Sequence, residues 1–350
     1  MSAAPAPLDG LRHLTAARVV LVLGLMALTT LASLLLAPLC GSAPLDLRRA
    51  FDFGRPMAEN PDAQVLFLFR LPRVLCAALA GAGLAAAGVA FQAVLRNPLA
   101  TPYTLGVSSG GALGAVLAIR LGLDALLGPA ALPSFAFAGA VGTVAVVYRV
   151  ARVGRNLPPA TLLLAGVTMS FVAGAFMMFV QYSADYSQSY RIVRWLMGGL
   201  DVGRPGLLWQ IFPPLALGLV LLQLRARDLN ALAAGSAAAA SVGVEVERTV
   251  LLVYLAASLI VGAVVAVAGP IGFVGLLVPH ALRRLLGPDH RVLLPASALG
   301  GAVFLVWCDT IARTVLAPAE IPVGVLTAMV GGPFFLWLLW RRKGRAGIWG

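Results

Sequence analysis

The chain is built from apolar runs long enough to cross a membrane, separated by short polar or basic segments. The run at 269–291 (GPIGFVGLLVPHALRRLLGPDHR) begins apolar, contains glycines and prolines, and turns basic at Arg283 and Arg284. Helix-breaking residues in an apolar segment that ends in arginines are typical of a membrane span ending at the cytoplasmic face. The pattern therefore favours a polytopic membrane protein over a soluble domain.

Composition supports this interpretation. Of 350 residues, 60% are hydrophobic and 11% are charged, and the mean hydropathy is +0.92. Because soluble domains carry roughly 25% charged residues, this chain has too few polar groups to cover a water-facing surface. The net charge of +12 comes from arginines at the ends of apolar runs rather than from a basic stripe interleaved with aromatic residues. We therefore expect a lipid bilayer, and no nucleic acid, as a partner.

The length of the apolar runs predicts an all-α fold with about ten transmembrane helices. A span needs about 20 apolar residues at a rise of ~1.5 Å each. The predicted spans are residues 18–39, 74–95, 105–121, 133–148, 160–182, 207–224, 249–268, 271–286, 292–316 and 322–340.

The positions of the arginines orient these spans. With a cytoplasmic N-terminus, the strong basic clusters fall inside, and both termini are cytoplasmic because the number of spans is even. Segments 1–17 and 344–350 are then cytoplasmic tails, and 18–343 is a single transmembrane domain. The expected external loops are 40–69, 122–132, 183–204 and 317–321. Five arginines on the outer side break the positive-inside rule and require another explanation: Arg70, Arg73, Arg191, Arg194 and Arg313.

Two segments do not have the character of spans. Residues 183–204 begin polar and become amphipathic around Trp195, which predicts an external loop with a short interfacial helix. Residues 228–247 are alanine-rich with few bulky apolar side chains, which predicts a cytoplasmic helical hairpin.

Several motifs follow one another along the chain: RLPRVLCAALAGAGLAAAGVAFQAVLRNPLATPYTLGVSSGGALG at 70–114, LLLAGV at 162–167, GPIGFVGLLVPH at 269–280, GPDHRVLLPASALGG at 287–301 and APAEIPVGVLTAMVGGPFFLWLL at 317–339. In this order they resemble the FecCD/BtuC-type permeases, the membrane subunits of type II ABC importers for ferric siderophores, haem and cobalamin. The first motif is similar to the second and third helices of that family, the second to the start of the fifth helix, and the remaining three to the last three helices.

The resemblance implies a ten-helix permease that forms a homodimer with the transport pathway on the dimer axis. It also implies two cytoplasmic ABC ATPase subunits, an external substrate-binding protein and a location in the bacterial inner membrane. The expected function is ATP-driven import of a bulky iron complex, such as a ferric siderophore or haem, or of cobalamin. No cofactor is expected, and the sequence does not distinguish among these substrates.

Arg70, Arg73 and Arg313 match the family's arginines that receive acidic residues of the binding protein. Arg70 and Arg73, three residues apart, would share one face at the outer end of a helix. The guanidinium fork suits paired contacts with carboxylates. The alternative is that these side chains snorkel to lipid headgroups, with Arg313 pairing to Asp309 one turn away.

The inner gate of similar permeases maps to four residues of this chain: Asn97, Leu99, Pro159 and Ala160. Pro98 forces a helix to break at this point. Pro159 and Ala160 stand where the cobalamin permease has a Thr-Ser pair, so half of the gate pattern has lost its hydroxyls. The alternative role of Asn97 is plain capping of the helix C-terminus.

The span at 160–182 is expected to line the pathway with a soft, weakly polar surface. The proposed lining residues are Thr161, Thr168, Met169, Ser170, Met177, Met178 and Gln181. The alternative is a methionine-rich packing face at helical spacing.

Residues 229–244 match the coupling helices that contact the ATPase, through Leu232, Gly235, Ser236, Ala239 and Gly243. The two glycines keep the family spacing, whereas Ser236 replaces an acidic residue and Ala240 an arginine. The connection is therefore expected to rely on shape and alanine packing rather than salt bridges. A passive linker is the alternative.

Other functional classes lack their signatures. The one lysine, Lys343, is not part of a GxxxxGK[ST] P-loop, so ATP hydrolysis requires a separate subunit and the chain is not expected to be an enzyme. His280, Asp289, His290 and Arg291 do not have metal-ligand spacing. An ion-coupled secondary transporter would show ionisable residues at mid-membrane. A membrane-embedded enzyme would need a catalytic cluster.

Overall fold

The computed structural model describes residues 16–343 except 53, 155, 201–205 and 207, and within these residues the chain is helical with no β-strand. The long helices are α1 (Ala16–Leu36), α4 (Leu71–Val94), α5 (Val107–Arg120), α7 (Ala131–Ala151), α8 (Pro159–Tyr182), α10 (Leu208–Leu224), α13 (Val246–Ala268), α14 (Val274–Leu286), α15 (His290–Thr314) and α16 (Val323–Lys343). The short helices are α2 (Leu47–Ala50), α3 (Pro61–Ala63), α6 (Leu123–Leu127), α9 (Tyr186–Leu196), α11 (Ala226–Ala233) and α12 (Ser236–Ser241).

Each of the ten predicted spans coincides with one long helix. Six of these helices are long and apolar enough to cross a membrane by themselves, and α10 with α11 passes the same test as a pair bent by 58°. Two others, α5 and α14, have 14 and 13 residues, which is short for a full crossing. Helices α13 and α14 end at Ala268 and Leu286, the predicted ends of those two spans, and each is followed by a Gly-Pro pair whose glycine has positive φ.

The second span begins earlier than predicted. A π-helix at Gln64–Arg70 joins α3 to α4, so that helical structure runs without interruption from Pro61 to Val94. Much of the expected loop 40–69 is therefore helical as well, with α2, α3 and a 3₁₀ turn at Met57–Glu59. As a result Arg70 and Arg73 both lie within one continuous helical segment.

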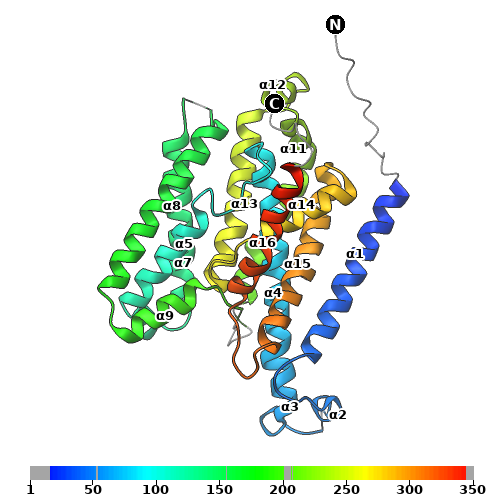
Figure 1. The fold of residues 1–350 in the computed structure, drawn as a ribbon, viewed down its shortest axis with the longest axis vertical. Coiled ribbons are helices and arrows are strands. Elements are labelled where there is room, and N and C mark those ends of the chain that lie inside the picture. Colours follow the sequence, from blue (N-terminus) through cyan, green and yellow to red (C-terminus); the bar gives the residue numbers. More distant parts are fainter. Residues whose placement is uncertain (1–15, 53, 155, 201–205, 207, 344–350) are drawn as a thin grey trace.

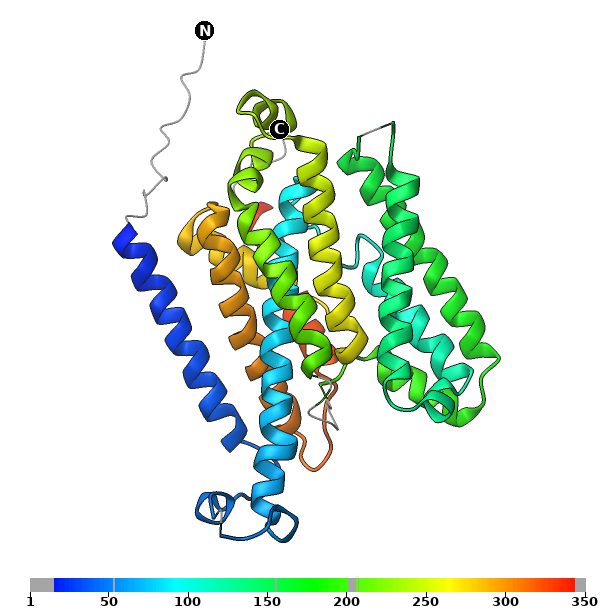
Figure 2. The same cartoon turned by 180° about the vertical axis from the view of Figure 1, so that it is seen from behind.

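Helix α4 is the centre of the bundle, packed between α13, α14 and α15 (Figures 1 and 2). Two glycine contacts bring the helix backbones together: Gly81 lies on the carbonyl group of Gly301 in α15, and Gly88 lies on Gly275 in α14. A Cβ atom at Gly81 or Gly88 would overlap the facing backbone. Small residues permit this close approach, which supplies the van der Waals contact that holds helices together in lipid.

The remaining helices flank this core. On one side, α5, α7 and α8 form a group with the amphipathic helix α9 beneath it (Figure 1). On the other side, α1 packs mainly against α15, where Trp307 donates a hydrogen bond of 3.0 Å from Nε1 to Ser33 Oγ. Short helices mark the two ends of the bundle. We call them the α12 end, with α11 and α12, and the α9 end, with α2, α3 and α9 (Figures 1 and 2).

Candidate functional site

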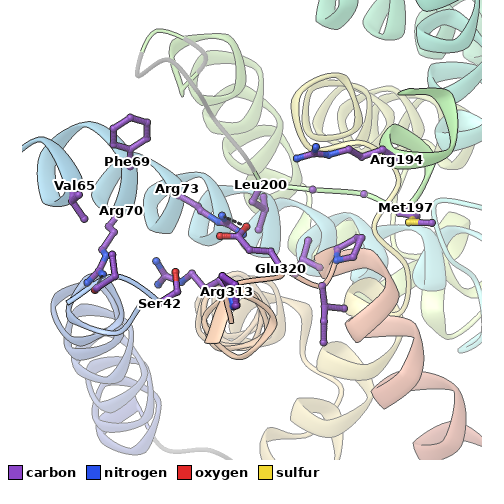
Figure 3. A pocket seen from close by; sticks show the side chains of 18 of the residues that line it. Ser42, Val65, Phe69, Arg70, Arg73, Arg194, Met197, Leu200, Arg313 and Glu320 are labelled. Atoms are coloured by element: carbon purple, nitrogen blue, oxygen red, sulfur yellow. Dashed lines mark hydrogen bonds and ion pairs between the residues drawn. The ribbon is translucent and has the colours of Figure 1, made fainter. Parts of the chain in front are cut away.

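Charged side chains gather at the α9 end in an arginine–carboxylate cluster, which comprises Arg70, Arg73, Asp309, Arg313 and Glu320. Arg70 ends the π-helix, Arg73 is in the first turn of α4, and Asp309 and Arg313 are in the last turns of α15. Glu320 lies in the connection from α15 to α16. The three arginines and Glu320 line a cavity of about 750 Å³ (Figure 3).

Arg73 is held between two carboxylates. On its inner side, Nε lies 3.0 and 3.1 Å from the two oxygens of Asp309, and Nη2 lies 3.0 Å from Oδ1. On its outer side, Nη1 donates a hydrogen bond of 2.7 Å to Glu320 Oε2 (Figure 3). The Asp309 side chain is fully buried, whereas that of Glu320 is 45% exposed.

The other two arginines are turned into the protein. The Arg70 guanidinium donates to the carbonyl oxygens of Pro38, Leu39 and Ala43, which cap the end of α1 and the segment after it. The Arg313 guanidinium donates to Ala37 O at 2.7 Å and to Thr310 Oγ1 at 3.2 Å. Both side chains are buried.

The structure thus brings the three predicted arginines together, and their guanidinium groups already contact carboxylates and carbonyls of this chain. The alternative pairing of Arg313 with Asp309 is present at 3.8 Å. The Arg73–Glu320 contact was missed, because 247 residues separate the partners and no local spacing signals it. One of the remaining outer arginines also has a partner, since Arg191 of α9 pairs with Asp124 of α6.

An apolar cavity of about 820 Å³ opens between the α4–α5 connection, the end of α9, the start of α14 and α16. Its lining residues are Thr101, Tyr103, Leu196, Met197, Pro270, Gly272, Phe273, Leu276, Gly324, Val325, Ala328 and Met329. Phe273 has a left-handed backbone, with φ of +66°, and its ring lies against Gly331 of α16. A non-glycine residue in this conformation is strained, and such strain persists only where packing over-determines it.

The predicted pathway residues are distributed around α8 instead of along one face. Thr161 and Ser170 donate hydrogen bonds to main-chain carbonyls, including Ser170 Oγ to Tyr103 O at 3.1 Å. Met169 and Met177 pack against the hydrophobic core, whereas Thr168 and Met178 are exposed. Gln181 is partly buried near the end of the helix. Sequence reasoning missed the cavity wall formed by Tyr103 and Phe273, although both lie in motifs that it quoted.

The predicted gate residues lie on two segments, the α4–α5 connection and the start of α8. Asn97 Oδ1 accepts a hydrogen bond of 2.9 Å from Leu99 N, which fixes the turn after α4. Leu99 is 37% exposed. Pro159 is the first residue of α8, where its missing N–H costs nothing, and Ala160 is exposed.

The predicted coupling segment forms α11 and α12 at the α12 end. Leu232 and Ala239 are buried on their inner faces, whereas Ser236 is exposed at the start of α12. Gly235 and Gly243 have φ of +118° and +85°, and the chain reverses direction at each of them. Glycine is the residue that adopts these angles without steric cost.

A polar contact fastens α11 to the start of α15. Asn230 Nδ2 donates to Asp289 Oδ1 at 2.8 Å, and Asn230 Oδ1 accepts from His290 N at 2.8 Å. Hydrogen bonds from Arg291, with a further one from Asn230, lower the pKa of Asp289 to about 2. Sequence reasoning considered Asp289 and His290 only as metal ligands. Among the described residues, no group of three or more His, Cys, Asp or Glu could hold a metal ion.

Several apolar helices long enough to cross a membrane, with charged clusters at their ends and an apolar cavity among them, define a multi-pass membrane protein. The model of the FecCD transport family matches residues 26–341, and the chain belongs to this family. The family assignment and the all-α permease fold implied by the motifs are thereby confirmed.

Similar proteins agree with this assignment. The cobalamin import system permease protein BtuC of Halobacterium salinarum is 44% identical over 285 residues, 81% of this chain and 76% of the relative. The hemin transport system permease protein HmuU of Yersinia pestis is 43% identical over 281 residues, 78% of this chain and 82% of the relative. A solved structure assigned to an inward-facing metal-chelate type ABC transporter has a TM-score of 0.79 at 32% identity, covering 92% of this chain and 99% of that one.

The family defines the role of the chain. It is the membrane permease component of an ABC importer and not an enzyme, because ATP is hydrolysed by a separate ATPase subunit. An ATPase and a substrate-binding protein are accordingly its partners in transport. The secondary-transporter and membrane-enzyme alternatives do not describe this family.

Proposed function

We propose that the chain imports a bulky metal complex, either an iron complex such as haem or a ferric siderophore, or cobalamin. The observation that carries this proposal is the pairing of an arginine-lined cavity at the α9 end with two short helices at the α12 end. The first suits an acidic docking protein and the second a motor subunit. The names of the relatives, which import cobalamin and hemin, support the substrate class.

The α12 end is proposed to face the cytoplasm of a bacterial cell, with the protein in the inner membrane. Basic residues lie in or just after the last turns of α7 and α14 and just after α10, at this end of the bundle, in agreement with the positive-inside rule: Arg149, Arg152, Arg283, Arg284, Arg225 and Arg227. Both termini would then be cytoplasmic, and α2, α3 and α9 would lie outside. Residues 1–17 and 344–350, the proposed tails, fall almost wholly outside the described part of the chain.

The working unit is proposed to be a homodimer with the pathway on its axis. The exposed side of α8 carries large apolar residues such as Phe171, Phe176 and Phe179, with Thr168 and Met178 among them. Ser170 ties this helix to Tyr103, one wall of the apolar cavity. A second copy placed against α8 would enclose the cavity walls in a shared passage.

The remaining predicted roles are proposed for the same assembly. Arg70, Arg73 and Arg313 form the docking region, Asn97, Leu99, Pro159 and Ala160 form the inner gate, and α11 and α12 contact the two ATPase subunits. The exposed Ser236 and the buried Ala239 support an ATPase contact made by shape, since neither side chain can form a salt bridge.

The test is uptake into proteoliposomes that contain the permease, an ABC ATPase and a binding protein encoded with it. We expect ATP-dependent accumulation of cobalamin, haem or a ferric siderophore, measured as trapped metal, with no uptake when the ATPase lacks its catalytic glutamate. Uptake that follows a proton or sodium gradient and ignores ATP would overturn the proposal. Affinity of the binding protein for each of the three ligands identifies the substrate.

A further inference from the structure

The two carboxylates on Arg73 differ in how firmly they are held. Asp309 makes a two-pronged contact with Nε and Nη2 and is fully buried, so removing it would leave a buried guanidinium without its counter-ion. Glu320 makes a single contact through Nη1, and its side chain is 45% exposed on the connection between α15 and α16. Ion pairs that are open to solvent contribute little free energy, so a competing carboxylate can replace Glu320 at small cost.

The charges around Arg73 favour the binding of an external carboxylate. Four arginines line the cavity, namely Arg70, Arg73, Arg194 and Arg313, against one lining carboxylate, Glu320. Asp309 lies directly behind and compensates a second charge. The cavity therefore keeps an excess of positive charge even with Glu320 in place, and it attracts carboxylates from solution.

Neither Arg70 nor Arg313 can offer an outward hydrogen bond as readily. Arg70 is committed to main-chain carbonyls of Pro38, Leu39 and Ala43, and Arg313 to Ala37 O and Thr310. Both side chains are buried. Of the three, Arg73 is the arginine whose outer donor is satisfied by a partly exposed carboxylate, that of Glu320.

We propose that Glu320 is a placeholder: it occupies the docking position on Arg73 in the free permease, and a carboxylate of the external binding protein displaces it on docking. The inference rests on the proposed docking role of the α9 end. It specifies that the incoming group is an Asp or Glu side chain that reaches Nη1 of Arg73. It also makes Glu320 a competitor that weakens docking, so that the binding protein dissociates more easily after delivery.

The test measures the affinity between the permease–ATPase complex in lipid nanodiscs and the binding protein that supports uptake in the proteoliposomes. Glu320→Gln removes the competing charge, and we expect binding about two- to fivefold tighter, the size set by a solvent-exposed ion pair. Glu59→Gln is the matched control, because it removes one exposed carboxylate from the same end without contacting Arg73. It should leave affinity close to wild type.

A double-mutant cycle assigns the effect to Arg73. Arg73→Gln should weaken docking, and adding Glu320→Gln to it should bring no further change. Arg73→Lys, which keeps the charge beside Asp309, serves the same purpose if Arg73→Gln does not fold. The proposed role of Glu320 is wrong if Glu320→Gln leaves the affinity for the binding protein unchanged or lowers it, or if Glu59→Gln raises that affinity equally. If neither Arg73 variant alters affinity, the proposed docking role itself fails.

Discussion

Helices α4 and α8 have the same length, 24 residues, and their spans have the same mean hydropathy of 2.1, yet they occupy opposite environments. Each span has a most apolar window of 18 residues. In the span that contains α4, 78% of that window is buried, whereas in α8 only 22% is buried. Hydropathy therefore identifies both as membrane helices but does not say which of them is central.

Residue size separates the two. Helix α4 is rich in alanine and has glycines at 81, 83 and 88, whereas α8 presents phenylalanines at 171, 176 and 179. Because lipid tails are as apolar as these side chains, no hydrophobic force drives bulky residues inward. Close packing of small residues decides which helix becomes the core. The comparison shows that, within a membrane, side-chain volume carries the information that polarity carries in water.

The largest expected difference between the two helices comes from truncating a phenylalanine in each. Phe91 of α4 is fully buried, with its ring centroid 6.4 Å from that of Tyr254. Phe91→Ala should reduce the free energy of unfolding by about 3–5 kcal/mol, because it leaves a cavity in the core. Phe171 is exposed on α8 in the single subunit, so Phe171→Ala should change the free energy of unfolding of the dissociated subunit by less than about 0.5 kcal/mol. Denaturation of the purified permease in detergent measures both.

Equal losses in the two phenylalanine variants would show that α8 is buried in the solubilised protein. If the Phe171→Ala variant unfolds like wild type but elutes as a smaller particle, the exposed side of α8 is an interface between copies.

The next largest effect is expected from adding a methyl group at a glycine of each helix, Gly81 in α4 and Gly174 in α8. A methyl group at Gly81 would overlap the carbonyl group of Gly301, so Gly81→Ala should destabilise the fold by about 1–3 kcal/mol through forced separation of α4 and α15. Gly174 of α8 has no atom within 4 Å of an added Cβ, and Gly174→Ala should be neutral or slightly stabilising. Thermal unfolding monitored by loss of the monodisperse peak distinguishes them. A stable Gly81→Ala variant would contradict the packing argument.

The smallest effect concerns two aspartates that cap helices next to these regions. Asp289 caps α15 and holds Asn230 of α11, and its pKa is lowered to about 2. A lowered folded-state pKa adds stability above the unfolded value, which is near 4, and that stability is lost as pH falls through about 2. We expect a decline in melting temperature between about pH 4 and pH 2 that is shallower in Asp289→Asn.

Asp185, at the N-terminus of α9, provides the comparison for this pH series. Its carboxylate accepts from Gln188 N and Ser187 Oγ within its own helix and does not join two helices of the core. Hydrogen bonds from Gln188 N and Ser187 Oγ lower the pKa of this solvent-exposed carboxylate as well, so Asp185→Asn should also flatten the pH dependence, but less than Asp289→Asn does because no second helix is released. A wild-type slope in Asp289→Asn would mean that other carboxylates cause the acid sensitivity.

Local sequence patterns predicted where most helices begin and end, but they did not predict the contacts between residues far apart in the sequence. Helices α13 and α14 end at the predicted residues, Ala268 and Leu286, because the Gly-Pro pair after each acts on the backbone where it occurs. The Arg73–Glu320 and Asn230–Asp289 contacts join residues 247 and 59 positions apart, and a single sequence contains no record of such distances. The seven α8 candidates lie on several sides of that helix, and their role in lining the pathway stays a prediction.

One consequence follows from the position of Gly301. Helix α15 has 25 residues, about 37 Å at about 1.5 Å per residue, and Gly301 is the twelfth of them. Its backbone contact with Gly81 therefore lies near the middle of a helix that begins at the Asn230 contact and ends in the arginine–carboxylate cluster. If α15 tilts about this contact, its two ends move in opposite directions, so a displacement at the cluster is accompanied by an opposite displacement at Asn230.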